Sequence, residues 1–126
     1  MTLRHKPHPN FILLYVDDPI ASAAFYASLL GKPAAEASPT FALFALDSGV
    51  MLGLWSRRTV EPAAVDCDAE LAIAVADGAA VDAAHAAWRT AGRAILQPPA
   101  ELDFGRSFVA TDPDGHRLRV FAPVAP

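Results

Sequence analysis

Four histidines and one cysteine are the side chains best suited to acid–base, nucleophilic or metal chemistry, and they are scattered along the chain. His5 and His8 stand among prolines near the N-terminus, which favours surface positions. His85 lies beside the apolar stripe of an expected helix, so we predict a partly buried structural histidine. Cys67 has no neighbouring base or cation to activate it as a nucleophile. A single cysteine also excludes an intramolecular disulfide and a cysteine zinc site.

The fourth histidine, His116, follows the sequence Asp112-Pro113-Asp114-Gly115. Proline presets φ for a tight turn and glycine accepts positive φ, so these residues predict the turn of a hairpin spanning Ser107–Pro123. Turn carboxylates commonly accept hydrogen bonds from their own backbone. We therefore expect the two aspartates to build the turn rather than an acid–base pair, and His116 to be exposed to solvent. The chain has no Ser/His/Asp order, P-loop or glycine-rich dinucleotide fingerprint.

The first half of the chain is expected to contain the same kinds of elements, in the same order, as the second half, which this hairpin completes. Asp18 can cap a helix whose first residue is Pro19, and Gly31 is placed to end it. Ile20 begins the expected apolar stripe of this helix, which continues through Ala24, Ala27 and Leu30. The first half is expected to contain a strand at Asn10–Val16, a helix from Pro19 to about Leu30, and a hairpin of strands at Thr40–Leu46 and Val50–Ser56.

A linker at Thr59–Asp68 separates this half from a second one with matching spacing. Val16 and Val75 are 59 positions apart, as are Asp18 and Asp77. Such a repeat indicates internal duplication. The second half is expected to contain a strand at Ala69–Ala76, a helix from Asp77-Gly78 to about Thr90, a short strand at Ala94–Leu96, a loop at Gln97-Pro98-Pro99, and the final hairpin.

Composition limits the class of protein. A chain of 126 residues with 53% hydrophobic and 19% charged residues suits a folded domain. A net charge of −4 argues against nucleic acid as a partner. No run approaches the roughly 20 apolar residues of a membrane span. Residues 1–9, expected to be a flexible arm, are not followed by an apolar signal core. We therefore expect a cytoplasmic protein with neither a nucleic-acid nor a membrane partner.

The two ends of the chain resemble a known family, the vicinal oxygen chelate superfamily, which includes glyoxalase I, extradiol dioxygenases and bleomycin-resistance proteins. The residues that carry this resemblance are Tyr15-Val16-Asp17-Asp18-Pro19, Phe25-Tyr26, Leu29-Leu30-Gly31 and the last hairpin from Asp112 to Val120. The resemblance implies an α+β fold in which two βαβββ modules, 10–58 and 69–122, form curved mixed sheets around a cavity within one domain. It also implies a homodimer.

Metal-dependent members of that family place one ligand on each of four strands. Carried over by position, these ligand sites fall on Phe11, near Gly53, on Glu70 and on Arg119. Phe and Gly offer no donor atom, and a guanidinium beside a divalent cation is strongly disfavoured. Glu70 could instead pair with Arg119, or each could face solvent. We therefore expect no metal cofactor at the usual place.

Aromatic side chains are the alternative source of binding chemistry. Trp55 ends an expected strand, and an aromatic ring with a polar handle suits stacking against a flat ligand. Arg106 and Arg119 could supply polarity. The residues predicted to bind a ligand are Phe41, Phe44, Trp55, Arg106, Phe108 and Arg119, with core packing and a dimer interface as the competing explanation for the aromatics.

The favoured hypothesis is a metal-free protein that binds an apolar, planar small molecule, as drug-sequestering resistance proteins do, with no catalytic residue. A second hypothesis is a lyase, isomerase or dioxygenase with an atypical site around Glu70 that uses His5 or His8. A third is an interaction module whose dimer face is the functional surface.

Overall fold

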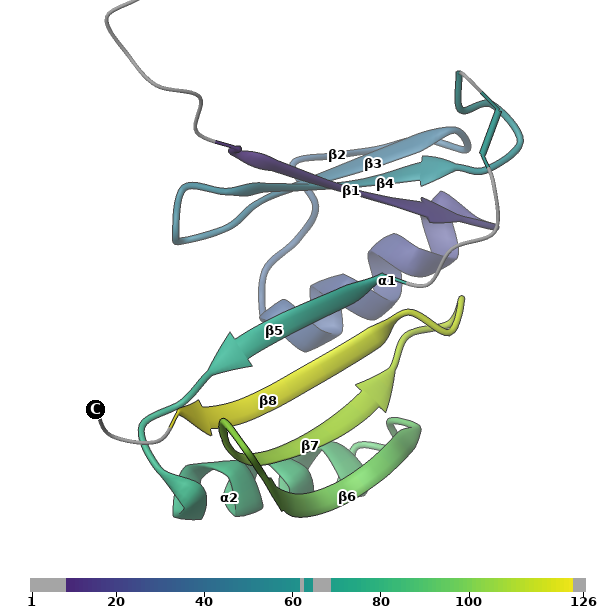
Figure 1. Ribbon diagram of the computed structural model, residues 1–126. Helices are drawn as coiled ribbons and strands as arrows, with labels where there is room; N and C mark the ends of the chain where they lie inside the picture. The colour runs from purple at the N-terminus through teal and green to yellow at the C-terminus, as the bar shows by residue number, and fades with distance from the viewer. Residues whose placement is uncertain (1–8, 62, 65–68, 124–126) are drawn as a thin grey trace, which may run out of the picture. The chain divides into compact units, whose positions relative to one another are not determined.

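The computed structural model describes residues 9–61, 63–64 and 69–123 and has an α+β fold (Figure 1). The chain divides into two compact units, Met1–Val65 and Asp66–Pro126. Each unit contains one helix and one mixed four-stranded sheet. The expected βαβββ plan is therefore present twice. The predicted roles of His5, His8, Cys67 and the N-terminal arm concern positions outside the described residues, apart from Pro9 at the end of the arm.

The first unit builds its sheet around one parallel pair of strands. Its strand order is β1-β4-β3-β2, with β1 parallel to β4 and the other neighbours antiparallel. The short strand β2 is not among the elements expected from the sequence for this half. The elements are β1 (Phe11–Val16), α1 (Pro19–Leu30), β2 (Glu36–Ala37), β3 (Phe41–Ala45) and β4 (Met51–Ser56).

Helix α1 begins and ends where the sequence predicts. The Asp18 carboxylate accepts hydrogen bonds from two backbone N–H groups, and Gly31 closes the helix with φ of 71°. The predicted apolar stripe is wrong, because Ile20 is 49% exposed. The residues that pack inward follow the spacing of one helix face and include the fully buried ring of Tyr26. They are Pro19, Ser22, Ala23 and Tyr26.

Strand alternation divides the first sheet into two faces. Helix α1 contacts β3 and β4, and one set of alternate side chains in the sheet is buried. The other set forms the face that points away from α1, which we call the first far face. The buried set is Leu14, Val16, Ala42, Phe44, Leu52 and Leu54. The first far face consists of Phe11, Leu13, Tyr15, Phe41, Leu43, Met51, Gly53 and Trp55.

The second unit repeats the arrangement with strand order β5-β8-β7-β6. Strand β6 includes Gln97-Pro98-Pro99, which the sequence analysis assigned to a loop. Prolines are tolerated there because β6 is an edge strand, and its register with β7 shifts on both sides of Gln97. The elements are β5 (Glu70–Ala74), α2 (Gly78–Thr90), β6 (Ile95–Leu102), β7 (Gly105–Thr111) and β8 (Arg117–Pro123).

Helix α2 is capped by Asp77, whose carboxylate accepts a hydrogen bond from the Ala80 N–H at 2.8 Å. His85 is a half-buried side chain in contact with the ring of Phe108, with centroids 5.3 Å apart. Trp88 packs edge-on against the same phenylalanine at 5.2 Å. The predicted partial burial of His85 is confirmed.

The hairpin turn between β7 and β8 is built by its own carboxylate. Asp112 Oδ1 accepts hydrogen bonds from the backbone N–H groups of Asp114 at 2.9 Å and His116 at 2.8 Å. The prediction that His116 is exposed is wrong, since it is buried. The Asp112 N–H donates to the His116 carbonyl, which draws that residue back into the hairpin.

Within the described part of the chain, neither helix is long and apolar enough to cross a membrane.

Candidate ligand-binding faces

Trp55 lies at the centre of an aromatic cluster on the first far face. Its ring centroid is 6.4 Å from that of Tyr15 on β1 and 6.4 Å from that of Phe41 on β3. The interplanar angles are 80° and 82°, so neither neighbour stacks flat on the indole. All three side chains are half-buried. Phe11, on the same face, is 53% exposed. The cluster therefore offers aromatic surface for contact with a flat molecule.

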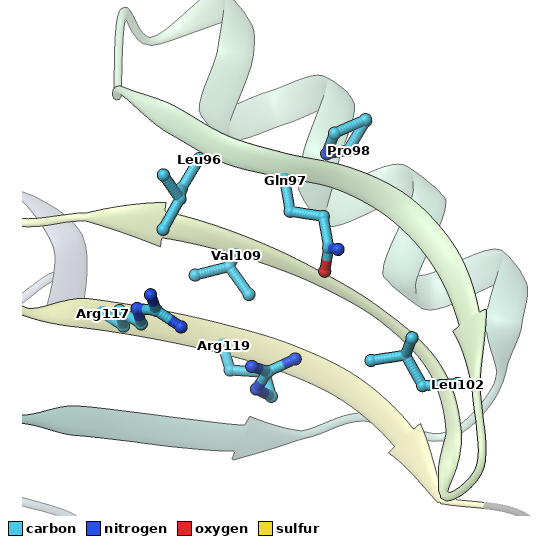
Figure 2. Close-up of a pocket in the computed structure, with 7 residues that line it drawn as sticks. All are labelled: Leu96, Gln97, Pro98, Leu102, Val109, Arg117 and Arg119. Carbon is cyan, nitrogen blue, oxygen red and sulfur yellow. The ribbon is translucent and has the colours of Figure 1, made fainter.

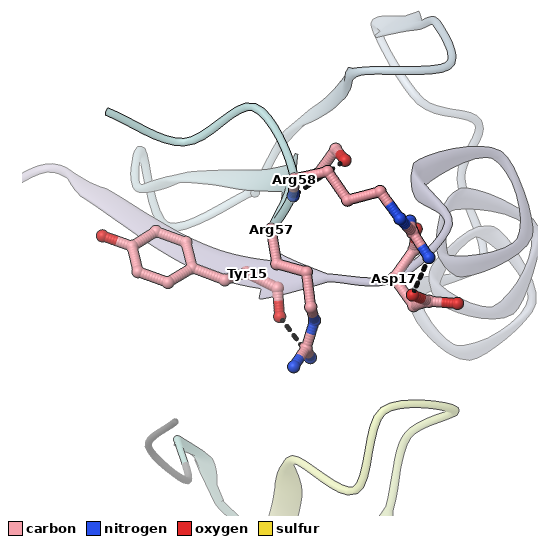
Figure 3. Close-up of polar contacts among 5 residues, drawn as sticks. Tyr15, Asp17, Arg57 and Arg58 are labelled. Atoms are coloured by element: carbon pink, nitrogen blue, oxygen red, sulfur yellow. Dashed lines mark hydrogen bonds and ion pairs between the residues drawn. The ribbon is translucent and has the colours of Figure 1, made fainter. Parts of the chain in front are cut away.

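Two arginines that follow β4 fix its C-terminal end against β1 (Figure 3). Arg57 Nη2 donates to the Tyr15 carbonyl at 3.2 Å. Arg58 donates to the Asp17 carbonyl at 2.7 Å and to Asp17 Oδ1 at 2.6 Å. Because Tyr15 and Trp55 are register partners at this end of the two strands, these bonds help to hold their side chains next to each other.

Gly53 occupies the middle of the first far face for a steric reason. A Cβ atom at this position would lie 2.6 Å from Leu13 Cδ2 and 2.9 Å from Phe41 Cζ. The leucine and phenylalanine side chains thus fill the space above the glycine. This part of the face is apolar and offers no side-chain donor.

The corresponding face of the second unit, which points away from α2 and which we call the second far face, is centred on an ion pair. Arg119 Nε donates to Glu70 Oε2 at 3.0 Å and Nη2 donates to Oε1 at 3.3 Å. Nη1 donates to Ser107 Oγ at 2.8 Å. The guanidinium carbon also lies 5.7 Å from the ring centre of Phe104. Of the alternatives open from the sequence, Glu70 pairs with Arg119, and the two lie on adjacent strands of one sheet.

A groove of about 400 Å³ lies over β6, β7 and β8 in the second unit (Figure 2). The side chains of Gln97, Val109 and Arg119 come from register partners on three neighbouring strands and therefore share one face. Arg117 lies two residues before Arg119 and shares that face. The groove is lined by Leu96, Gln97, Pro98, Leu102, Val109, Arg117 and Arg119.

The six residues predicted to bind a ligand do not come together in either unit. Phe41 and Trp55 lie on the first far face. Phe44 and Phe108 are fully buried on the helix sides of their sheets. A ligand could reach those two rings only by opening the hydrophobic core. Their burial identifies both phenylalanines as core residues.

Arg106 is bound by two carboxylates of its own unit. Its Nε donates to Asp82 at 2.8 Å and its Nη1 donates to Glu101 at 3.1 Å. These hydrogen bonds, with the one to Asp82 the stronger cause, raise the pKa of Arg106 above its ordinary value. A ligand anion would have to compete with two resident carboxylates, so Arg106 is a poorer candidate for ligand binding than its sequence position suggested.

Sequence reasoning did not select Tyr15, Gln97 and Arg117 for the site. Tyr15 lies on the same face as Phe11, and Arg117 on the same face as Arg119, because residues two apart in a strand point the same way. That period of two is the signal that identifies Tyr15 and Arg117. Gln97 gave no comparable signal, since the strand that contains it was assigned to a loop.

Comparison with known proteins identifies the family. Two βαβββ units with these faces define a glyoxalase-like protein. Residues 8–120 match the Glyoxalase/Bleomycin resistance protein/Dioxygenase superfamily, and the chain belongs to it. The resemblance read from the sequence is thereby confirmed.

The names of the similar proteins differ in how specific a function they state. The phenazine antibiotic resistance protein EhpR of Enterobacter agglomerans is 28% identical over 115 residues, which cover 89% of each chain. A protein from Agrobacterium tumefaciens, solved by NMR in solution, is 52% identical, with a TM-score of 0.87 over 95% of this chain and 100% of that one. A glyoxalase/bleomycin resistance protein/dioxygenase from Nocardioides is 26% identical, with a TM-score of 0.82 over 97% of this chain and 87% of that one.

The residues at the metal-ligand positions implied by the family do not fit a metal. Phe11 and Gly53 supply no donor atom, and the carboxylate of Glu70 is bound by Arg119. The fourth position is that same arginine, a permanent cation. Within residues 9–61, 63–64 and 69–123, no group of three or more His, Cys, Asp or Glu side chains is placed to hold a metal ion.

Proposed function

We propose that this protein binds a planar, largely apolar small molecule on the first far face and acts by sequestering it. The observation that carries the proposal is the cluster of Trp55, Tyr15 and Phe41, in which no ring is stacked flat on another. The similarity to a phenazine antibiotic resistance protein supports the same chemistry, since a phenazine is a flat tricyclic aromatic molecule. Sequestration alone protects a cell, so the function requires no catalytic group.

The physical basis is burial of aromatic surface. Removing apolar area from water is worth about 25 cal/mol per Å². An offset-stacked or edge-to-face aromatic pair adds about 0.5–1.5 kcal/mol beyond that burial. A flat ligand against Trp55, bordered by Tyr15 and Phe41, gains both contributions. The surrounding Phe11, Leu13 and Met51 side chains extend the apolar surface without introducing a charge.

The proposal assigns the protein no metal, because the donor set at the family positions is unsuited to one. It retains from the sequence analysis a homodimer in the cytoplasm with neither nucleic acid nor a membrane as partner. It leaves out Phe44 and Phe108 as ligand contacts because their rings are inside the core.

Equilibrium dialysis of the full chain against phenazine tests the proposal. We expect saturable binding, and we expect Trp55→Leu to weaken it about tenfold or more, because about 1.4 kcal/mol of stacking and burial corresponds to tenfold in Kd. The matched control is Trp88→Phe, which alters the other tryptophan of the chain in a different environment, packed on Phe108. Circular dichroism checks that both variants remain folded.

The bound phenazine should be recovered chemically unchanged. Equal affinity of the Trp55→Leu variant and the wild-type chain would overturn the location of the site. A stoichiometric transition metal in the purified protein, together with turnover that a chelator abolishes, would replace sequestration by an enzymatic function.

A further inference from the structure

The groove of the second unit contains two arginines in different electrostatic states. Arg119 is balanced by Glu70 through two hydrogen bonds and also donates to Ser107. The exposed Arg117 side chain makes no hydrogen bond or ion pair with any residue in the described part of the chain. Within the described part of the second unit, the Arg117 guanidinium is therefore the one cation of the groove lining without a bound carboxylate.

We infer that this groove binds a monoanionic small molecule, a carboxylate attached to an apolar body, with Arg117 as its anion-binding residue. Arginine suits a carboxylate because its planar guanidinium donates two parallel hydrogen bonds to the two oxygens. Because the Glu70–Arg119 pair is neutral, one added negative charge completes the balance. The structure supports a monoanion over a phosphate dianion for the same reason.

The remaining lining determines the rest of the ligand. Leu96 is 54% exposed, and Leu102 is also exposed at the opposite end of β6. Between them, Val109 projects from β7, and the Gln97 side chain extends over the sheet (Figure 2). Apolar walls with one polar amide and one free cation are typical of small-molecule sites, and about 400 Å³ lies within their usual size range.

This inference goes beyond the proposed function and does not depend on it. It concerns the second unit, Arg117 and an anionic group, whereas the proposed function concerns the first unit, Trp55 and a neutral aromatic surface. The two can fail separately, because phenazine has no carboxylate and the test below uses a smaller anionic probe.

The test is a titration of the ¹⁵N-labelled full chain with 1-naphthoate, followed by two-dimensional NMR, with the neutral 1-naphthamide as the paired probe. We expect saturable shift changes at the amides of Gln97, Leu102 and Val109. We expect the amide probe to bind at least about tenfold more weakly, because a neutral amide cannot form a charge-assisted hydrogen bond with the guanidinium. Raising the salt concentration should weaken naphthoate binding.

Three variants distinguish a specific site from general attraction to a cation. Arg117→Gln should weaken naphthoate binding about tenfold, whereas Arg117→Lys should weaken it less, because the charge remains but the two parallel hydrogen bonds are lost. Arg89→Gln is the matched control, since it removes the same charge from an exposed position on α2 and should leave naphthoate affinity unchanged. Equal Kd values for naphthoate and naphthamide, unchanged binding by Arg117→Gln, or shift changes confined to the first unit would each overturn the inference.

Discussion

The two sheets share one backbone plan, yet their far faces have opposite chemistry. In each unit the first strand runs parallel to the last one, and the register of that pair places equivalent residues side by side. The face built on β1 and β4 is apolar and aromatic, whereas the face built on β5 and β8 has charged side chains at two of the three matching places. Phe11–Met51 in the first unit matches Glu70–Arg117 in the second. Likewise, Leu13–Gly53 matches Ala72–Arg119, and Tyr15–Trp55 matches Ala74–Phe121.

The two tryptophans show the same difference. Trp55 lies on the first far face, with Tyr15 and Phe41 beside it. Trp88 belongs to α2 and packs on the buried Phe108. Both tryptophans are half-buried, but Trp55 lies on the far face of its sheet and Trp88 on the helix side of the other. A repeated fold can in this way present an aromatic face in one unit and a charged face in the other.

The largest expected effect concerns Phe108, whose assignment to the core underlies this comparison. Phe108→Ala removes a fully buried ring in contact with His85 and Trp88, so we expect it to lower the free energy of unfolding by about 3–5 kcal/mol. Phe11→Ala, at an exposed position of the first far face, should cost less than about 1 kcal/mol. Urea denaturation followed by circular dichroism measures both values.

A conservative variant keeps this prediction measurable if Phe108→Ala does not fold. Phe108→Leu should cost about 1–2 kcal/mol and leave phenazine affinity unchanged, since the ring is inaccessible. A folded Phe108→Leu protein of normal stability that has lost phenazine binding would show that Phe108 contacts the ligand, and the division between core and surface would be wrong.

The fold could be predicted from the sequence because the residues that specify its helix ends and turns are close together in the chain. Asp18, Pro19 and Gly31 specify α1, and Asp112 with Gly115 specifies the last turn, since caps and turns depend on a few adjacent residues. The sequence did not show which face of α1 packs against the sheet. This depends on how Tyr26 packs against the sheet, which is a tertiary contact.

The candidate site was only partly readable for the same reason. Strand alternation could place Tyr15 on one face with Phe11, and Arg117 on one face with Arg119. It could not show that Arg106 is held by Asp82 from another element, or that β6 continues through two prolines. The pairing of Glu70 with Arg119 was open in the sequence, and the strand register alone does not decide it, because Glu70 lies opposite Arg117 and reaches Arg119 diagonally.

An intermediate effect is expected from the ion pair of the second far face. Glu70→Gln leaves Arg119, whose side chain is 17% exposed, without its counter-charge. We expect a loss of about 1–2 kcal/mol in the free energy of unfolding, between the small value of surface pairs and the large cost of breaking buried ones. The same variant should strengthen 1-naphthoate binding, because the groove then contains two unbalanced cations. Chemical denaturation and NMR titration measure the two results.

The first unit supplies the control for this ion pair. Lys32 Nζ donates to Asp47 Oδ1 at 2.8 Å, but the aspartate side chain is 98% exposed. Asp47→Asn should therefore change the free energy of unfolding much less than Glu70→Gln does, because an exposed ion pair contributes little. If Asp47→Asn cost as much as Glu70→Gln, burial would not be what distinguishes the two pairs.

The smallest effect is the pH dependence of that exposed pair. The hydrogen bond from Lys32, followed by the attraction of its charge, lowers the pKa of Asp47 below the ordinary 3.8. Since the folded pKa is lower than the unfolded one, the pair stabilises the protein above pH 3.8, and this contribution is lost as the pH falls through the folded pKa.

Carboxyl-carbon NMR titration should place the Asp47 midpoint below the ordinary value, and Lys32→Gln should return it toward that value. Because the pair is solvent-exposed, 1 M salt should largely remove the depression of the Asp47 pKa. The stability difference between wild type and Glu70→Gln should change little under the same salt, because the Arg119 side chain is mostly buried. An Asp47 midpoint unaffected by Lys32→Gln would assign the lowered pKa to another cause. If salt affected both ion pairs equally, burial would not explain the electrostatic difference between them.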